Sequence, residues 1–253
     1  MLVARARDPQ VATALAGVIG GLLFAPVALA TWHVDSAALP YAAASAAIHV
    51  AYFALLALAY TRADLSVVYP LARGIAPPLV LIGAVVVLSE SPSLVQAAGV
   101  LAVAAGVMLI RGLRGGDRPG ELLGLSVGVT IAIYTVVDKQ GVAHASPLPY
   151  LLLLNLPAST LYLGWMVRAR GRVRVRGELR PQTVLTGIGI MGAYGLTLAA
   201  LKLGPASGVA ATRETSILVA TLLGALFLHE RVGAMRAAGA AAIVAGVAAV
   251  ALG

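Results

Sequence analysis

The 253-residue sequence contains no cysteine, which excludes disulfide bonds, thiolate chemistry and cysteine-ligated metal sites. Charged residues are also scarce, at 11% of the chain against about 25% in an ordinary soluble domain. Hydrophobic residues make up 60% of the chain. This composition excludes a soluble globular domain. We therefore expect a multi-pass protein of the cell membrane, with the lipid bilayer as its first partner.

The net charge of +8 would indicate a nucleic-acid partner only if basic and aromatic residues shared one face. The basic residues lie mostly in short loops between apolar segments, so we expect no nucleic-acid binding. The histidines show no metal-ligand spacing, and no glycine-rich phosphate loop of the ATPase kind is present. We expect no metal and no other cofactor. The lack of catalytic motifs and of an extramembrane domain predicts a protein that is not an enzyme.

A helix needs about 20 apolar residues to cross roughly 30 Å of hydrocarbon. Nine segments meet this requirement, and their connections are short except for residues 168–181. The predicted fold class is an all-α, polytopic membrane helix bundle. The predicted spans are residues 11–31, 41–60, 65–88, 94–110, 121–138, 148–167, 182–201, 206–228 and 234–252.

Lysine and arginine are distributed unequally between alternate loops. Two of them, Lys139 and Lys202, lie on one side of the predicted spans, and fourteen lie on the other. Loops rich in these residues stay in the cytoplasm, so the count places the N-terminus and loop 168–181 inside. The fourteen are Arg5, Arg7, Arg62, Arg111, Arg114, Arg118, Arg168, Arg170, Arg172, Arg174, Arg176, Arg180, Arg231 and Arg236.

The chain repeats itself at an offset of 140 residues. Residues 97–107 and 237–247 are identical at seven of eleven positions, and Arg73 aligns with Arg213. Alanine matches arise easily by chance in apolar segments, whereas aligned glycines and charges do not. Repeated halves around a polar site at the membrane midplane are typical of secondary transporters.

The first four spans align with the last four, but span 121–138 has no mate because its equivalent would precede Met1. The pattern predicts two inverted repeats of five helices, with the first helix missing and 4 + 5 helices present. We assign residues 1–112 to the first repeat and 120–253 to the second. A misplaced start codon, a genuine nine-helix protein and a truncation are the explanations left open for the missing helix.

Arg73 is a candidate substrate-binding residue because it lies deep inside an apolar span. A charged residue at the centre of a membrane helix costs roughly 2.5–3.5 kcal/mol on insertion, and such residues usually face an interior cavity. Tyr69 precedes it by one helical turn, and Pro70, Pro77 and Pro78 interrupt the same span. Arg73 could anchor an anionic substrate group. The alternative is a structural arginine satisfied by carbonyls that the prolines leave unpaired.

The aligned span of the second half carries Thr212, Arg213 and Glu214 in sequence. In the functional interpretation, Arg213 and Thr212 contribute to substrate binding and Glu214 exchanges a proton. In the alternative, Arg213 and Glu214 are a neutral ion pair that merely makes insertion tolerable. Asn155 and Tyr134 are polar residues inside other spans from which a substrate site could draw.

Three further patterns have structural interpretations. Asp138-Lys139 ends a predicted span and is expected to be an interfacial pair, with gating of the external mouth as the alternative. Glu90 and Glu230 are expected to anchor turns. Glycines at four- and seven-residue spacing allow close helix contact, within the chain or in a homodimer.

Tyr69-Pro70-Leu71-Ala72-Arg73-Gly74, Arg213-Glu214-Thr215-Ser216 and the glycine- and alanine-rich last helix of each half resemble the EamA-type branch of the drug/metabolite transporter superfamily. The resemblance covers essentially the whole chain. It implies ten helices in two inverted repeats around a central cavity. It also implies transport, often export, of small metabolites or drugs, commonly coupled to a proton or to exchange.

The leading hypothesis is therefore a secondary transporter that moves a small-molecule substrate by alternating access of the two repeats. A flippase for lipids or lipid-linked sugars with the same architecture is the first alternative. A truncated membrane subunit that does not itself transport is the second. The family is usually drawn with both termini inside, whereas the charge count puts a completed ten-helix version with both termini outside, so both orientations stay open.

Overall fold

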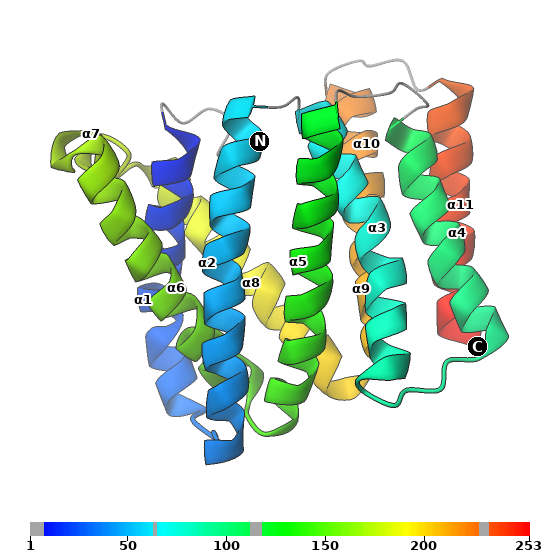
Figure 1. The fold of residues 1–253 in the computed structure, drawn as a ribbon, viewed down its shortest axis with the longest axis horizontal. Coiled ribbons are helices and arrows are strands. Elements are labelled where there is room, and N and C mark those ends of the chain that lie inside the picture. Colours follow the sequence, from blue (N-terminus) through cyan, green and yellow to red (C-terminus); the bar gives the residue numbers. More distant parts are fainter. Residues whose placement is uncertain (1–7, 63–64, 112–117, 228–232) are drawn as a thin grey trace. The chain divides into compact units, whose positions relative to one another are not determined.

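The structure is a computed structural model that describes residues 8–62, 65–111, 118–227 and 233–253. Within these ranges the chain forms α-helices and no strand, apart from one isolated antiparallel bridge between Val34 and Ala145 (Figure 1). Apolar runs this long have no water to satisfy their backbone in a bilayer, and a helix satisfies it internally. The predicted all-α membrane fold class is confirmed.

The helices follow one another with short connections. They are α1 (Pro9–Ala30), the 3₁₀ turn η2 (Ser36–Ala38), α2 (Leu39–Arg62), α3 (Leu65–Val86), α4 (Leu94–Arg111), α5 (Arg118–Ala143), α6 (Pro147–Arg170), α7 (Arg172–Arg176), α8 (Pro181–Leu203), α9 (Ala206–Arg213), α10 (Thr215–Phe227) and α11 (Ala234–Leu252).

Seven of these helices are long and apolar enough to cross a membrane: α1, α2, α3, α5, α6, α8 and α11. Helix α4 is apolar but slightly shorter than the others. The prediction of one continuous span over residues 206–228 is wrong, because the helix is broken at Glu214 into α9 and α10. The predicted end of span 121–138 is also wrong, since α5 continues to Ala143 and keeps Asp138 inside the helix.

The helices form two compact units, and each unit combines segments from both halves of the sequence. Unit 1 contains Met1–Phe53 and Val137–Leu203, and unit 2 contains Ala54–Val136 and Gly204–Gly253. Helices α2 and α5 each contribute residues to both. The two sequence repeats, 1–112 and 120–253, are therefore not the compact units, and their boundaries stay a prediction.

In unit 1, α1 packs against both α6 and α8 through glycine. A Cβ on Gly17 would lie 2.2 Å from the hydroxyl oxygen of Ser159 on α6. A Cβ on Gly20 would lie 2.6 Å from the carbonyl oxygen of Gly187 on α8. Small residues let helix backbones approach closely in a membrane, where dispersion and hydrogen bonds drive association. The first glycine pattern thus serves packing within the chain.

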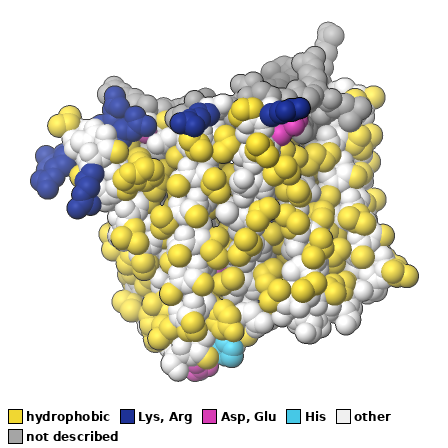
Figure 2. Space-filling model, in the orientation of Figure 1, with side chains coloured by type: hydrophobic (Ala, Val, Ile, Leu, Met, Phe, Trp, Pro, Cys, Tyr) yellow, Lys and Arg dark blue, Asp and Glu magenta, His cyan; other side chains and the backbone are white. Residues whose placement is uncertain are grey.

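The two ends of unit 1 differ in charge. At one end Arg170 lies 3.7 Å from Asp8, and the exposed arginines of α7 extend from the same region (Figure 2). At the other end the connections after α1 and α5 meet, since the Asp35 amide donates to the His144 carbonyl. The side of the unit between these ends is largely covered by hydrophobic side chains in this view. This separation agrees with the predicted asymmetry of the loops.

In unit 2, α4 and α11 lie side by side and antiparallel (Figure 1). A Cβ on Gly99 would lie 2.7 Å from the Gly246 carbonyl oxygen, and a Cβ on Gly106 would lie 2.6 Å from that of Gly239. At the offset of 140 residues, Gly99 corresponds to Gly239 and Gly106 to Gly246. Each contact is therefore the image of the other, as two inverted copies of one helix require.

The other glycine patterns also face neighbouring helices of their own unit. A Cβ on Gly128 of α5 would lie 3.0 Å from the Ala72 carbonyl oxygen of α3, and one on Gly124 would lie 3.2 Å from that of Val68. A Cβ on Gly208 would contact Val250. These contacts account for the glycine spacing without a second copy of the chain. A homodimer stays a prediction.

Candidate functional site

Helix α3 carries Arg73 through the interior of unit 2. The prolines predicted to interrupt it do not end it, since α3 is continuous from Leu65 to Val86. Pro77 and Pro78 have no N–H groups, so the carbonyls of Arg73 and Gly74 lack the donors that a regular helix would supply. The polar character of this level of α3 thus comes from the backbone as well as from the guanidinium group.

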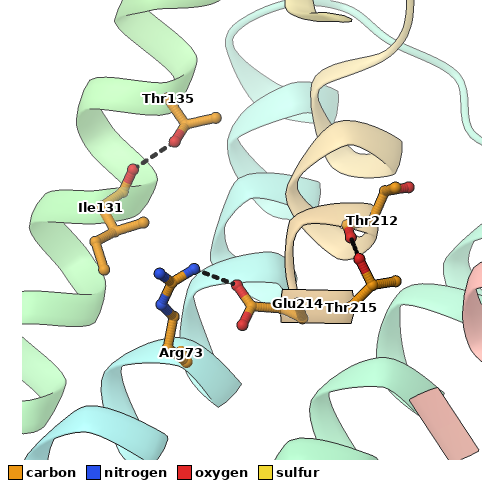
Figure 3. Close-up of polar contacts among 6 residues, drawn as sticks. All are labelled: Arg73, Ile131, Thr135, Thr212, Glu214 and Thr215. Atoms are coloured by element: carbon orange, nitrogen blue, oxygen red, sulfur yellow. Dashed lines mark hydrogen bonds and ion pairs between the residues drawn. The ribbon is translucent and has the colours of Figure 1, made fainter. Parts of the chain in front are cut away.

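The facing helix of unit 2 is broken at the level of Glu214. Helix α9 ends at Arg213 and α10 begins at Thr215. The Glu214 amide donates to Ala211, and the Ile217 amide donates to the Glu214 carbonyl, both three residues apart. Such tight bonds mark a local 3₁₀ turn. The Thr215 hydroxyl donates to the Thr212 carbonyl at 2.7 Å, which satisfies a backbone group near the break (Figure 3).

Arg73 and Glu214 meet at this break. The guanidinium Nη1 of Arg73 donates to Oε1 of Glu214 at 3.3 Å (Figure 3). The Glu214 side chain is only 4% exposed, whereas that of Arg73 is 24% exposed. The second carboxylate oxygen, Oε2, is buried and has no hydrogen-bond partner among the described residues. The pair therefore combines a buried acceptor with a base that reaches toward the surface of unit 2.

Two of the other predicted residues lie near this pair. The Arg73 guanidinium carbon lies 5.4 Å from the ring centroid of Tyr69, which is a cation–π distance. Arg213 is close enough to act electrostatically on Glu214. The Thr212 hydroxyl donates to the Gly208 carbonyl at 2.9 Å, although the residue as a whole is exposed. The structure thus brings Tyr69, Arg73, Arg213 and Glu214 together.

The two halves of the sequence contribute unequally to this site. At the offset of 140 residues, Arg73 corresponds to Arg213, but Glu214 corresponds to Gly74. A Cβ on Gly74 would lie 2.2 Å from the terminal methyl carbon of Met108. Unit 2 therefore holds two arginines but one carboxylate at these four aligned positions. This leaves one positive charge in excess, which suits an anionic ligand.

Asn155 lies in unit 1, away from the set around Arg73. Its side-chain amide donates to the Gly17 carbonyl at 2.9 Å, and its carbonyl accepts from Ser159 at 3.2 Å. It joins α1 to α6. Tyr134 is buried on the unit 2 part of α5. Among the described residues, no three His, Asp or Glu side chains gather as a metal site would require.

A buried polar cluster in unit 1 was not assembled by the sequence analysis. Asp138 is fully buried and accepts hydrogen bonds from the hydroxyls of Tyr150, at 3.0 Å, and Tyr194. Lys139 instead donates to the Leu201 carbonyl at 2.7 Å. The predicted interfacial pair of Asp138 and Lys139 is therefore wrong, because consecutive side chains of a helix point about 100° apart. A lone aspartate in an apolar helix is the signal that pointed here.

Glu90 has a structural partner. Both of its carboxylate oxygens accept from the Ala206 amide, at 2.9 and 3.1 Å. Ala206 begins α9, so the carboxylate satisfies a donor that a helix start leaves unpaired and also complements the helix dipole. The expectation that Glu90 is structural agrees with this contact. Its counterpart Glu230 lies outside the described residues.

Comparison with known proteins places this architecture. The profile of the EamA-like transporter family matches residues 118–252. A solved structure titled only as the crystal structure of a protein has the same fold, with a TM-score of 0.83. It is 21% identical in sequence, and the match covers 99% of this chain and 91% of that one. No curated protein sequence matches the chain.

The family match covers more than half of the chain and includes the broken helix with Arg213 and Glu214. Members of the family are membrane transporters of the drug/metabolite type rather than enzymes, so a lipid bilayer and a small-molecule substrate are its partners. The apolar helices agree with a multi-pass membrane protein. The chain therefore belongs to the EamA-like transporter family.

Proposed function

We propose that the chain is a secondary active transporter that exports small metabolites or drugs across the cell membrane by alternating access. The observation that carries the proposal is the Arg73–Glu214 ion pair at the break between α9 and α10. Broken helices with polar backbone and charged side chains are typical of substrate sites in secondary transporters. Family membership supports transport in general, and the ion pair supports a substrate that carries an anionic group.

In the proposed mechanism, the anionic group of the substrate competes with Glu214 for Arg73. Arginine presents donors in a planar fork that suits a carboxylate, and Tyr69 holds the guanidinium over its ring. Arg213 supplies the second positive charge. A Glu214 displaced from Arg73 would leave a buried carboxylate, and a proton taken up there removes the cost of that charge. Substrate binding and protonation of Glu214 are thereby linked.

A thermal-stability panel on purified protein tests the binding step. The compounds are amino acids, carboxylates, sugars, nucleosides and cationic drugs. A ligand that binds only the folded protein raises its unfolding temperature. We expect stabilisation by a class that carries a carboxylate, and no stabilisation of Arg73→Ala. The control is Arg176→Ala, because Arg176 lies exposed on α7.

Transport itself is tested in proteoliposomes with a ¹⁴C-labelled mixture of the protein amino acids. We expect counterflow with the wild-type protein and with Arg176→Ala, and none with Arg73→Ala. Correctly inserted Arg73→Ala with wild-type counterflow would remove the assigned role of this residue. Stabilisation by a lipid-linked sugar alone, with dependence on its prenyl tail, would instead favour a flippase.

A further inference from the structure

The cluster around Asp138 in unit 1 has a defined hydrogen-bonding geometry. Asp138 and Ser45 are both 0% exposed, and the Asp138 carboxylate binds the Ser45 hydroxyl as well as those of Tyr150 and Tyr194. These donors come from three different helices, α2, α6 and α8. A carboxylate that accepts from three hydroxyls is well solvated by the protein although it has no contact with water.

Gly141 makes the contact with Tyr150 possible. It lies about one turn after Asp138 on α5, and a Cβ there would come within 2.3 Å of the Tyr150 ring and hydroxyl oxygen. Any larger residue would displace the ring from α5. The absence of a side chain at Gly141 therefore lets the buried Tyr150 hydroxyl reach the Asp138 carboxylate at 3.0 Å.

His49 connects this buried cluster to a partly exposed position. Its Nδ1 lies 2.8 Å from the Ser45 carbonyl oxygen and 3.3 Å from the Ser45 hydroxyl oxygen. A carbonyl oxygen only accepts, so Nδ1 carries the hydrogen and Nε2 is the nitrogen that gains a proton. The ring also packs edge-on against Tyr194, with centroids 5.6 Å apart.

The other charged groups of unit 1 have partners elsewhere. On α5, Lys139 donates to the Leu201 carbonyl, and on α8, Lys202 donates to the Ala145 carbonyl at 2.9 Å. Helix α1 carries no titratable side chain. The groups that face Asp138 are thus His49 from α2, Tyr150 from α6 and Tyr194 from α8. Of these, histidine is the one that ordinarily gains and loses a proton near neutral pH.

We propose that His49 and Asp138 form a proton-binding site of unit 1, and that this site couples transport to protons. With neutral His49 and ionised Asp138, the cluster has a charge of −1 inside membrane helices. One bound proton makes the cluster neutral, and membrane helices hold a buried net charge only at considerable cost. The coupling rests on the proposed transport function, whereas proton binding does not.

The Ser45 hydroxyl provides a path for this proton. A proton binds at Nε2 of His49, the Nδ1 hydrogen passes to the Ser45 oxygen, and the Ser45 hydroxyl hydrogen passes to Asp138. The product is a neutral histidine with its hydrogen on Nε2, an intact serine and a neutral carboxylic acid. One proton has entered, and no bond between heavy atoms has changed. The partly exposed imidazole receives the proton and the buried carboxyl group stores it.

Histidine NMR tests proton binding without any transport substrate. The full chain is labelled with ¹³C and ¹⁵N histidine in lipid nanodiscs, and its four histidine signals are assigned with single His→Gln variants. We expect neutral His49 to carry its hydrogen on Nδ1. We expect its titration midpoint to move by about one pH unit or more in Asp138→Asn, since a nearby charge has effects of this size. The matched control is Asp35→Asn, in an exposed loop.

Coupling is tested in proteoliposomes with the ¹⁴C amino acid mixture, with and without an imposed pH gradient. We expect the gradient to accelerate wild-type uptake by about five-fold or more, which is a typical coupling between two sites. His49→Gln and Asp138→Asn should keep counterflow and lose this acceleration. His144→Gln is the control, because His144 stacks on Tyr41 outside the cluster.

The outcomes separate this proposal from the transport function. A His49 signal that does not titrate between about pH 5 and 8, or that titrates identically in Asp138→Asn, overturns the proton site. Counterflow in all proteins with full acceleration in His49→Gln and Asp138→Asn overturns the coupling and leaves transport intact. No counterflow with the wild-type protein contradicts amino-acid transport, while the NMR result still decides whether the proton site exists.

Discussion

At the scale of single residues, the charged side chains inside apolar helices identify where this protein departs from a passive helix bundle. Arg73 and Glu214 were conspicuous in the sequence because charges are rare in membrane spans. Their mutual ion pair was not predictable, since they are 141 positions apart in sequence. The expected local pair of Arg213 and Glu214 is only one part of the electrostatic environment of this carboxylate.

The Arg73–Glu214 pair has separable structural and functional effects. Arg73→Leu removes the guanidinium group and leaves a buried carboxylate without its partner, which should lower the free energy of unfolding by on the order of 3 kcal/mol. The double variant Arg73→Leu/Glu214→Leu should recover most of that loss, because apolar residues can replace a buried ion pair. Neither protein should transport.

Thermal unfolding in detergent, with the two single variants and the double variant as a cycle, measures this coupling. Equal losses that simply add in the double variant would show that Arg73 and Glu214 do not stabilise each other. Counterflow by the stable double variant would remove both residues from the substrate site.

At the scale of the elements, the helices of unit 2 show how one sequence pattern becomes two structures. Helix α3 continues through Pro70, Pro77 and Pro78, whereas its counterpart in the second half is broken at Glu214. Proline was the expected helix breaker. The break instead occurs where a buried carboxylate reaches Arg73 on the facing helix, which is a tertiary contact.

Close packing of α4 and α11 depends on glycine. In Gly106→Ala the new Cβ would lie 2.6 Å from the backbone carbonyl oxygen of Gly239, and a backbone atom cannot move aside as a flexible side chain can. We expect a loss of about 1–3 kcal/mol in the free energy of unfolding. Gly246→Ala, the equivalent change in the other repeat, should have a similar effect.

Gly192→Ala on α8 is the matched control, because nothing lies within 4 Å of its Cβ position. It should leave the unfolding temperature unchanged or raise it slightly, since alanine favours a helix. An equal response of Gly106→Ala and Gly192→Ala would contradict close contact between α4 and α11.

The start of α9 depends on Glu90. Glu90→Ala leaves the Ala206 amide without its carboxylate acceptor and should lower stability by about 1 kcal/mol. Glu90→Gln keeps an oxygen acceptor and should lose less. Thermal unfolding distinguishes the two variants, and a full loss with both would point to charge rather than to hydrogen bonding at the helix start.

At the scale of the whole molecule, each compact unit is assembled from both halves of the chain. An interleaved assembly of this kind allows two inverted repeats to share packing. The predicted charge asymmetry agrees with unit 1, where the arginines of α7 and the lysines near Ala145 lie at opposite ends. That asymmetry makes a prediction about topology.

Single-cysteine labelling tests the topology, and the native chain is already free of cysteine. Val173 is 87% exposed on α7, and Asp35 lies in the exposed connection after α1. We expect a membrane-impermeant maleimide to label Asp35→Cys from outside intact cells and Val173→Cys only after the membrane is permeabilised. The reverse pattern would invert the orientation, and labelling of both from one side would contradict the separation of the two ends.

The sequence alone determined the membrane class, the helices, the repeat and the importance of Arg73, because hydropathy, length and rare charges are local properties of a chain in lipid. Only the tertiary structure decided which partners these residues have. It pairs Arg73 with Glu214, uses Asn155 to join α1 to α6, and buries Asp138 among Ser45, Tyr150 and Tyr194. Such contacts depend on how the faces of distant helices turn toward one another, and a uniformly apolar sequence leaves that rotation almost unmarked.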